Sequence, residues 1–333
     1  MSAVLVTGGA GYVGSHICKA LYQEGFQPVV IDNLSRGFRS LVQYGPIIQG
    51  DISDASLLRN IYEKYRFHSV VHCAAFAYVG ESVEKPELYY DNNVAQTIGF
   101  FNALSELNIA NIIFSSSCAT YGIPEETPIA PSCPQNPINP YGETKLVIEK
   151  LIQSYATARD YNYAILRYFN VAGAHPDLEI GELHDPETHL IPLAIRAALD
   201  DQYEITIFGD DYTTPDGTCI RDYIHVADLA CAHTKALKRL TVGSDKSVIL
   251  NLGNGLGVSV MQIIEMVQNV TGQAVKYKVG PRREGDPASL IADAQDAYTQ
   301  LDWSCEYSDL KTMIQTAVAW YRKNESISSN SHI

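Results

Sequence analysis

The sequence is short of positive charge and contains no long apolar run. Its 333 residues include 24 Lys and Arg against 38 Asp and Glu, which gives a formal net charge of -14. A surface of that sign repels phosphate backbones, so we expect neither nucleic acid nor a membrane as a partner. No stretch is long enough to span a bilayer, and the N-terminus lacks the basic and apolar regions of a signal peptide. We therefore expect a cytoplasmic protein.

Paired cysteines are also missing. The count of seven is odd, no two form a CxxC pair, and several lie in apolar runs, where Cys behaves as a small hydrophobic residue. This pattern argues against a disulfide framework and a zinc site, and it favours a reducing compartment. The seven are Cys18, Cys73, Cys118, Cys133, Cys219, Cys231 and Cys305.

Three histidines lie near acidic residues in one segment: His175, His184 and His189. Their spacing matches no standard set of metal ligands, and the chemistry inferred below needs no metal. We expect no metal site.

The first half of the chain alternates short apolar runs with longer helical patterns. This alternation predicts an α/β fold with a doubly wound parallel (Rossmann) sheet covered by helices on both faces. The expected strands are Ala3–Thr7, Pro28–Ile31, Ile47–Gln49, Ser69–Cys73, Asn111–Ser115 and Tyr163–Arg167. The expected helices are Gly14–Glu24, Ala55–Tyr65, Pro86–Leu107 and Gly142–Arg159.

The pattern changes after Asn170. Gly173–Pro192 is rich in Pro, His and acidic residues and reads as a long functional loop. Shorter mixed elements follow and predict a smaller α/β lobe, so we divide the chain into residues 1–170 and 171–323. Residues 324–333 are rich in Ser and Asn and are expected to fray. The elements expected in the smaller lobe are Pro192–Leu199, Ile205–Phe208, Val226–Leu240 and Val260–Val270.

A glycine-rich turn joins the first strand to the first helix. Gly8, Gly11 and Gly14 have the spacing GxxGxxG. Such glycines allow a tight turn and close backbone approach to a pyrophosphate, which the following helix N-terminus attracts. Alone, the motif is equally compatible with a simple strand–turn–helix connection.

The second strand ends at Asp32, at the distance from the glycines expected of a ribose-binding acid. A carboxylate there accepts from a 2′-hydroxyl and repels a 2′-phosphate, so it favours NAD over NADP. Other residues that follow strands are placed to line the same cofactor: Asn33, Asp51, Ile52, Cys73, Ala74 and Ala75.

Tyr141 and Lys145 form a YxxxK pair at the start of a helix, where the i, i+4 spacing puts both side chains on one face. An ammonium beside a phenol lowers the pKa of Tyr from about 10, and such a Tyr can remove a proton from a hydroxyl. Ser117 ends the preceding strand, where ligands bind in such sheets. The alternative is a surface Tyr beside a solvated Lys.

These features together resemble the extended short-chain dehydrogenase/reductase family, and more closely its UDP-galactose 4-epimerases. The similar segments are TGGAGYVGSH, VGESVEKPELYYDNNV, FSSS, NPYGETK, LRYFNVAGAHP, GTCIRDYIHV, LNLGNG and PRREGD. The resemblance implies that a bound NAD is retained through turnover, with Tyr141 as base, Lys145 tuning it and Ser117 hydrogen-bonded to the reacting hydroxyl. It implies NAD binding by residues 1–170 and UDP-sugar binding mainly by residues 171–323.

The resemblance also implies further contacts. Asn170 would meet the sugar or phosphate, Arg221 and Arg283 the diphosphate, Asp286 the uridine ribose and Phe208 the uracil. Further cofactor contacts would come from Tyr12, Val13, Asn92, Ser115 and Tyr168. Further substrate contacts would come from Phe169, His189, Leu190, Tyr223 and Leu290. In relatives, helices equivalent to Pro86–Leu107 and Gly142–Arg159 form a homodimer interface.

Three positions depart from relatives. Ala77 stands where many have a Lys near the nicotinamide ribose, His189 where well-known relatives have an Asn, and Leu290 where some have a Tyr. The sugar therefore stays open: UDP-glucose and UDP-galactose are favoured, with UDP-N-acetylglucosamine, UDP-uronate or UDP-pentose as alternatives.

Two other functions are less favoured by the residues. A 4,6-dehydratase needs an acid and a base beside the Ser, and this chain has Cys118, Ala119 and Thr120 there. A non-catalytic NAD-sensing regulator would have lost the Tyr or the Lys.

Overall fold

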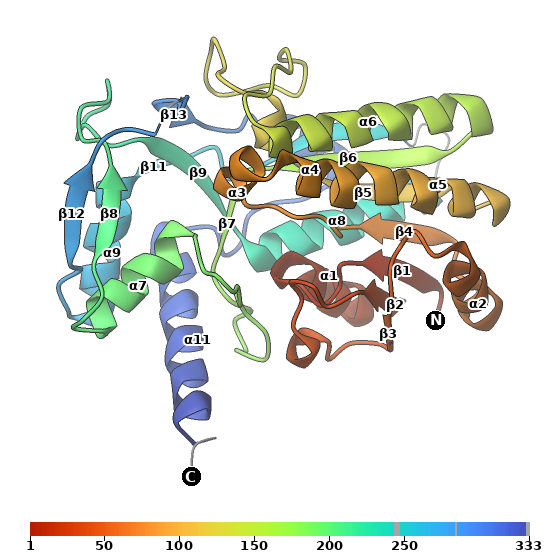
Figure 1. Cartoon of the computed structure of the whole chain (residues 1–333), viewed down its shortest axis with the longest axis horizontal. Helices are drawn as coiled ribbons and strands as arrows, with labels where there is room; N and C mark the ends of the chain where they lie inside the picture. Colours follow the sequence, from red (N-terminus) through yellow and green to blue (C-terminus); the bar gives the residue numbers. More distant parts are fainter. Residues whose placement is uncertain (243–246, 284, 331–333) are drawn as a thin grey trace.

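Seven parallel strands form the central sheet of the larger lobe (Figure 1). The computed structural model describes residues 1–242, 247–283 and 285–330. The strand order β10-β6-β5-β4-β1-β2-β3 reverses between β1 and β4, and ligands bind at such a switch point. This confirms the predicted Rossmann fold. The strands are β1 (Ala3–Thr7), β2 (Gln27–Asp32), β3 (Ile47–Gln49), β4 (Ser69–His72), β5 (Asn111–Ser117), β6 (Asn162–Tyr168) and β10 (Val248–Leu252).

Helices cover both faces of this sheet because the strands are apolar on both sides. One face buries Val6 and Leu166 against Ile17 and Leu229, which come from α1 (Tyr12–Gln23) and α8 (Val226–Thr241). The other face is covered by α2 (Ala55–Tyr65), α5 (Gln96–Glu106) and α6 (Pro140–Arg159).

The segment before β5 is not one continuous helix, although Pro86–Leu107 was expected to be one. It consists of α3 (Val79–Glu84), α4 (Pro86–Tyr89), the π-helical turn η2 (Tyr90–Ala95) and then α5. A π turn shifts the helical register by one residue and is frequent near functional sites. Short 3₁₀ turns also occur at η1 (Arg39–Leu41) and η3 (Cys118–Thr120).

The smaller lobe is built around its own apolar core, to which Ile195, Ile207 and Ile264 contribute. Its strands are β7 (Asn170–Ala172), β8 (Ile205–Phe208), β9 (Ile220–His225), β11 (Gly257–Ser259), β12 (Tyr277–Gly280) and β13 (Ser289–Leu290). Its helices are α7 (Leu190–Leu199), α9 (Val260–Thr271) and α11 (Leu310–Asn330).

Two elements of the second half belong to the larger lobe. β10 extends the main sheet beside β6, and α8 packs against α1, β5 and β6, although α8 was expected in the smaller lobe. The short α10 (Gln295–Leu301) packs on both of them. The last helix continues to Asn330, past Asn324 where fraying was expected, and residues 331–333 lie outside the described residues.

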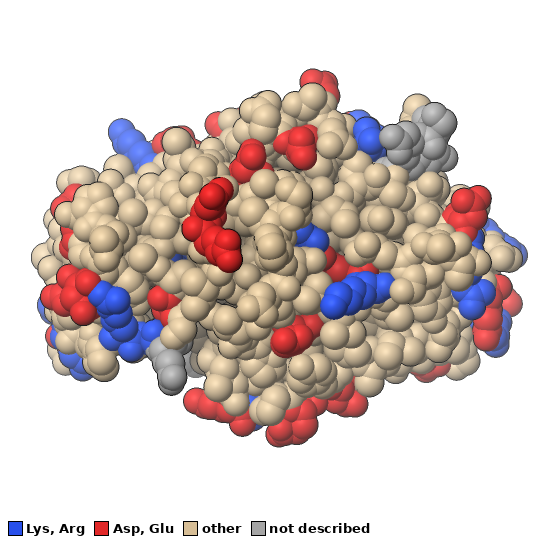
Figure 2. Space-filling model, turned by 90° about the horizontal axis from the view of Figure 1, so that it is seen from above, with Lys and Arg blue, Asp and Glu red and all other residues tan. Residues whose placement is uncertain are grey.

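On the face seen in Figure 2, acidic and basic side chains are interspersed, and the described Lys and Arg residues form no continuous patch on it. No helix in the described part of the chain is long and apolar enough to cross a membrane. All seven cysteines are free thiols, as expected.

Candidate active site

The turn after β1 has no room for side chains larger than hydrogen at two of its glycines. Gly8 has a φ of +70°, and a Cβ there would lie 2.7 Å from the amide nitrogen of Ala74. A Cβ on Gly14 would lie 2.2 Å from the carbonyl oxygen of Gly8. Gly11 is the N-cap of α1 and offers no side chain to the first-turn amides, which leaves them for an anion. The turn therefore fits a dinucleotide pyrophosphate, with Val13 in the first turn of the helix.

Asp32 lies at the carboxyl end of β2 and is held by backbone amides. Its Oδ2 accepts from Ala10 at 3.0 Å and its Oδ1 accepts from Leu34 at 2.8 Å. Burial raises the pKa of this carboxyl, and the two amide hydrogen bonds oppose that rise. Since each oxygen keeps a lone pair, the group can still accept from ribose hydroxyls.

The other expected cofactor residues lie along the same edge of the sheet. Asp51 follows β3, and its Oδ1 accepts from the amide of Ser53 at 2.9 Å. Cys73 follows β4, and its Sγ lies 3.1 Å from the hydroxyl of Ser115. Asn92, in the π turn, donates to Asn93 at 2.9 Å. The remaining expected cofactor residues on or next to these strands are Asn33, Ile52, Ala75 and Tyr168.

Ser117 and Tyr141 meet at the end of β5. Helix α6 begins there because Asn139 caps it by accepting from the amide of Gly142 at 2.9 Å and because Pro140 suits the first helical position. Ser117 ends β5, and Tyr141 lies in the first turn of α6. Burial raises the pKa of Tyr141 to about 12, although Lys145 was expected to lower it, and the neighbouring Ser117 side chain opposes the rise. The phenol and the hydroxyl that were expected to share a substrate group are thus neighbours.

Lys145 is buried one turn further along α6. Its Nζ donates to the carbonyl oxygen of Ser115 at 2.7 Å and lies 4.9 Å from the centre of the Phe114 ring. Burial lowers the pKa of this ammonium to about 8. The sequence could not predict this anchor, because it joins α6 to the backbone of β5.

A buried polar network beneath the site escaped the sequence analysis. Glu149 and Arg167 form a buried ion pair at 2.7 Å, and Arg167 also donates to the Tyr121 hydroxyl at 2.8 Å. Asn93 accepts from the amide of Phe76 at 2.8 Å and donates to Thr144 of α6 at 3.1 Å. The network ties the strands and helices that carry Ser117 and Tyr141 to one another. Polar residues at core positions of helical patterns were the only signal for it.

The expected substrate residues gather on β7, β9, β13 and the adjoining turns. Arg221 pairs with Asp286, so the groups expected to meet the diphosphate and the uridine ribose are already neighbours. The guanidinium of Arg283 lies 4.0 Å from the centre of the Phe208 ring, on a face that was expected to stack on uracil. Asn170 is in register with Tyr223 across β7 and β9.

Leu290 and Phe169 pack together with Cys118, which follows Ser117 in the chain. Leu290 is also in register with Arg221 across β13 and β9. This leucine therefore lies between the catalytic end of β5 and the expected diphosphate residue.

His189 and Leu190 lie on the other side of the site, at the start of α7. His189 is the N-cap of that helix, and its ring centre lies 4.6 Å from that of His184. Burial lowers the pKa of His189, but the neighbouring carboxylates of Glu182 and Glu187 raise it overall to about 10. His175 is not part of this group, since it lies beside Asp177.

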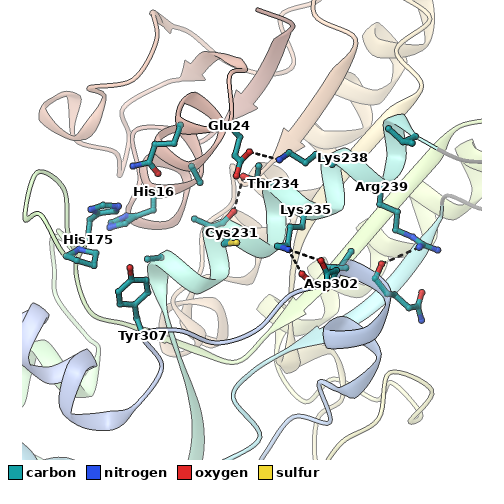
Figure 3. A pocket seen from close by; sticks show the side chains of 18 of the residues that line it. His16, Glu24, His175, Cys231, Thr234, Lys235, Lys238, Arg239, Asp302 and Tyr307 are labelled. Carbon is teal, nitrogen blue, oxygen red and sulfur yellow. Dashed lines mark hydrogen bonds and ion pairs between the residues drawn. The ribbon is translucent and has the colours of Figure 1, made fainter.

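A separate groove lies elsewhere. It has a volume of about 850 Å³ and lies between α1 and α8, and it is lined by His16, His175 and Lys235 among others (Figure 3). Charged side chains of this groove form ion pairs with one another, such as the pair between Lys238 and Glu24 at 2.5 Å. None of Ser117, Tyr141 and Lys145 lines it. The groove is therefore not the catalytic site.

The fold and the site define a class of protein: a Rossmann-type enzyme of the short-chain dehydrogenase/reductase kind, with a glycine turn, an acid at the end of the second strand and a Ser, Tyr and Lys set. Residues 4–253 match the NAD dependent epimerase/dehydratase family. The chain belongs to that family, which confirms both the resemblance and the expected NAD cofactor.

Named relatives cover nearly the whole chain. A UDP-glucose 4-epimerase of Halalkalibacterium halodurans is 47% identical over 97% of this chain and 96% of its own length. The crystal structure of the Brucella ovis UDP-glucose 4-epimerase in complex with NAD has a TM-score of 0.93, 49% identity, and coverage of 96% of this chain and 98% of that one. The Bifidobacterium longum enzyme in complex with NAD⁺ and UDP has a TM-score of 0.92 at 35% identity, with coverage of 97% and 99%.

Proposed function

We propose that this protein interconverts UDP-glucose and UDP-galactose by inverting C4 of the sugar. The observation that carries the proposal is the juxtaposition of Ser117, at the carboxyl end of β5, with Tyr141 and Lys145 of α6, where the Nζ of Lys145 donates to the carbonyl oxygen of Ser115 at 2.7 Å. A proton acceptor and a hydroxyl-binding group here would suit a ligand bound at the carboxyl ends of the strands. The chain has 47% and 49% sequence identity with two UDP-glucose 4-epimerases, which supports the choice of substrate.

NAD, when bound, accepts the hydride of C4 and returns it. Tyr141 removes the proton of the 4-hydroxyl, and Ser117 holds that hydroxyl in place. Lys145 favours the phenolate by its positive charge. After oxidation the keto sugar must turn and present its other face, so the sugar has to be held loosely.

The nucleotide, in contrast, has to be held firmly while the sugar turns. Arg221 and Arg283 would hold the diphosphate, Asp286 the uridine ribose and Phe208 the uracil. When the nucleotide binds, Arg221 and Asp286 would either separate or keep their ion pair while each also contacts the nucleotide. In this arrangement the larger lobe holds NAD and the smaller lobe holds the UDP-sugar.

We also propose that the protein is a cytoplasmic homodimer. Seven free thiols fit a reducing compartment. Exposed apolar side chains occur on the segments that were expected to form the interface, namely Tyr90, Ile98 and Val147, and two more, Val79 and Val83, lie on α3 just before them. Helices α5 and α6 lie side by side on one face of the sheet (Figure 1).

The test is to incubate the purified protein with UDP-galactose and no added NAD. UDP-glucose should appear until equilibrium, without NADH accumulating in proportion, because the hydride returns. Denatured protein should release NAD. Steady NADH production would show a dehydrogenase instead, and turnover of only another UDP-sugar would reject the proposed substrate.

A further inference from the structure

Four side chains of the loop between β7 and α7 converge on one point. They are Glu182, His184, Glu187 and His189, and one ligand atom from each lies within 4.8 Å of the others. We call this set the His–Glu cluster. All four come from eight consecutive residues, so a single loop supplies the whole set.

The spacing of the atoms resembles that of metal ligands. Oε1 of Glu182 lies 3.2 Å from Nδ1 of His184 and 3.2 Å from Nδ1 of His189, and Nδ1 of His184 lies 3.3 Å from Oε2 of Glu187. Ligands at about 2.0–2.1 Å from a tetrahedral zinc ion lie about 3.3–3.4 Å from one another. The fourth separation, from Nδ1 of His189 to Oε1 of Glu187, is shorter at 2.8 Å, and both contacts of Glu187 with the histidines are hydrogen bonds.

Glu182 supplies the second observation. Its side chain is only 7% exposed, yet its Oε1 makes no hydrogen bond to any described residue. It forms ion pairs with both imidazole nitrogens at 3.2 Å, but it accepts no hydrogen bond from them. A buried carboxylate oxygen that accepts no hydrogen bond is costly, so a group that fills this point would stabilise the loop.

We propose that the His–Glu cluster binds a divalent transition-metal ion, with zinc as the best match. Two imidazole nitrogens and two carboxylate oxygens form a ligand set that zinc accepts in tetrahedral sites. When the ion displaces the protons of the ligating nitrogens, two neutral histidines and two carboxylates carry two negative charges together, which the ion would neutralise. The proposal goes beyond the epimerase function and does not depend on it.

The position of the cluster indicates a structural role. The His184 ring lies 6.0 Å, edge to face, from the ring of Tyr12, the first residue of α1 after the glycine turn. The hydroxyl of Tyr12 in turn donates to the carbonyl of Gly173, where the long loop begins. His189 caps α7 of the smaller lobe. An ion at this point would fix the loop between β7 and α7 where it contacts the first residue of α1.

The sequence argued against a metal because it considered His175 with the other two histidines. In the structure, His175 pairs with Asp177 outside the cluster, and Glu182 and Glu187 complete the set instead. This makes His175 a matched control within the same loop.

The test measures metal content and thermal stability in the whole protein with its retained cofactor. Protein grown with zinc and dialysed against metal-free buffer should hold about one zinc per chain by mass spectrometry. Removing the ion with a chelator should lower Tm by at least about 3 °C, and zinc should restore it. Cobalt(II) added to the stripped protein should give the visible absorption of tetrahedral coordination.

Three variants show where the ion binds. His184→Gln and the isosteric Glu182→Gln should lose the bound zinc and its effect on Tm, whereas His175→Gln should keep both. Circular dichroism checks that each variant is folded. The proposal is overturned if stripped wild-type protein given one equivalent of zinc shows no Tm shift. It is equally overturned if folded His184→Gln and Glu182→Gln both retain the ion, or if His175→Gln loses it to the same degree.

Discussion

The Nζ of Lys145 lies 5.8 Å from the centre of the Tyr141 ring, while it donates a 2.7 Å hydrogen bond to the carbonyl oxygen of Ser115. The two side chains share a face of α6, as their i, i+4 spacing predicts. The ammonium is therefore held between the strand below it and the phenol beside it. Because both groups are buried, we expect a charge on Lys145 to act on the Tyr141 phenolate, once it forms, with little screening by water.

We expect Tyr141→Phe to lower kcat by about 10²-fold or more, because it removes only the acid–base hydroxyl. UDP binding should persist, since the proposed nucleotide contacts lie in the other lobe. The measurements are steady-state epimerisation and calorimetric titration with UDP. Tyr155→Phe is the control, because it makes the same change on the same helix, where the hydroxyl contacts Asn102. A near-wild-type rate for Tyr141→Phe would remove this residue from the catalytic role.

The sequence was sufficient for the parts of the fold that depend on local pattern. The strands that carry Gly8, Asp32 and Ser117 end within two residues of their predicted positions, because apolar runs and their end signals are local. Tyr141 and Lys145 were found because their relationship depends on helical spacing alone.

What the sequence did not predict depends on contacts between distant segments. The ion pair of Glu149 and Arg167 joins α6 to β6, and neither residue differs in sequence from a surface charge. β10 pairs with β6 in the main sheet, although elements of the smaller lobe precede it in the sequence. The order of elements along the chain therefore assigns α8 to the wrong lobe. The His–Glu cluster depends on a loop conformation that no periodic pattern encodes.

We expect Asp32→Asn to narrow the preference for NAD over NADP. Asparagine keeps the size of the side chain but removes the negative charge that repels a 2′-phosphate. Since it can keep only one of the two amide hydrogen bonds, a modest loss of NAD affinity should accompany the change. The measurement is the ratio of the two dissociation constants after the retained cofactor is removed. An unchanged ratio, or NADP released from the wild-type protein, would contradict this assignment of Asp32.

The buried pair beneath the site should matter more for stability than an exposed pair of similar geometry. Glu149→Ala leaves the buried guanidinium of Arg167 without its carboxylate, and we expect a loss of about 3–5 kcal/mol in the free energy of unfolding. The control is Glu106→Ala, which breaks the exposed 3.0 Å pair with Arg59 and should cost less than about 1 kcal/mol. Urea denaturation measures the free energy of unfolding of both variants. Equal losses would show that the buried pair stabilises the fold no more than the exposed pair does.

Light scattering should show a dimer at micromolar concentration. Ile98 on α5 is 41% exposed and belongs to the apolar group on the proposed interface helices. Ile98→Asp should produce monomers, because it places a charge in the centre of a desolvated surface. Ile123→Asp is the control, since Ile123 is 60% exposed but lies outside those helices. A monomeric wild-type protein, or a dimer that tolerates Ile98→Asp, would reject the interface.

The sugar preference is the least constrained part of the proposed function. Leu290 packs with Phe169 and Cys118, and Cys118 directly follows Ser117, so this leucine adjoins the place where the reacting hydroxyl is held. Leu is smaller than Tyr and has no hydroxyl. We therefore expect Leu290 to leave more space beside the sugar for a 2-acetamido group than a Tyr would.

We expect the protein to accept UDP-N-acetylglucosamine as a secondary substrate, and Leu290→Tyr to reduce that activity. One apolar wall discriminates by only about 1–3 kcal/mol, so the preference should be graded rather than absolute. The measurement compares kcat/KM for UDP-galactose and UDP-N-acetylgalactosamine in wild type and variant. Leu290→Met serves as the control, because it changes the shape of the wall while nearly conserving its volume. If Leu290→Tyr lowers both activities equally, the residue supports the site without gating it, because only a steric gate at the acetamido group would lower one activity selectively.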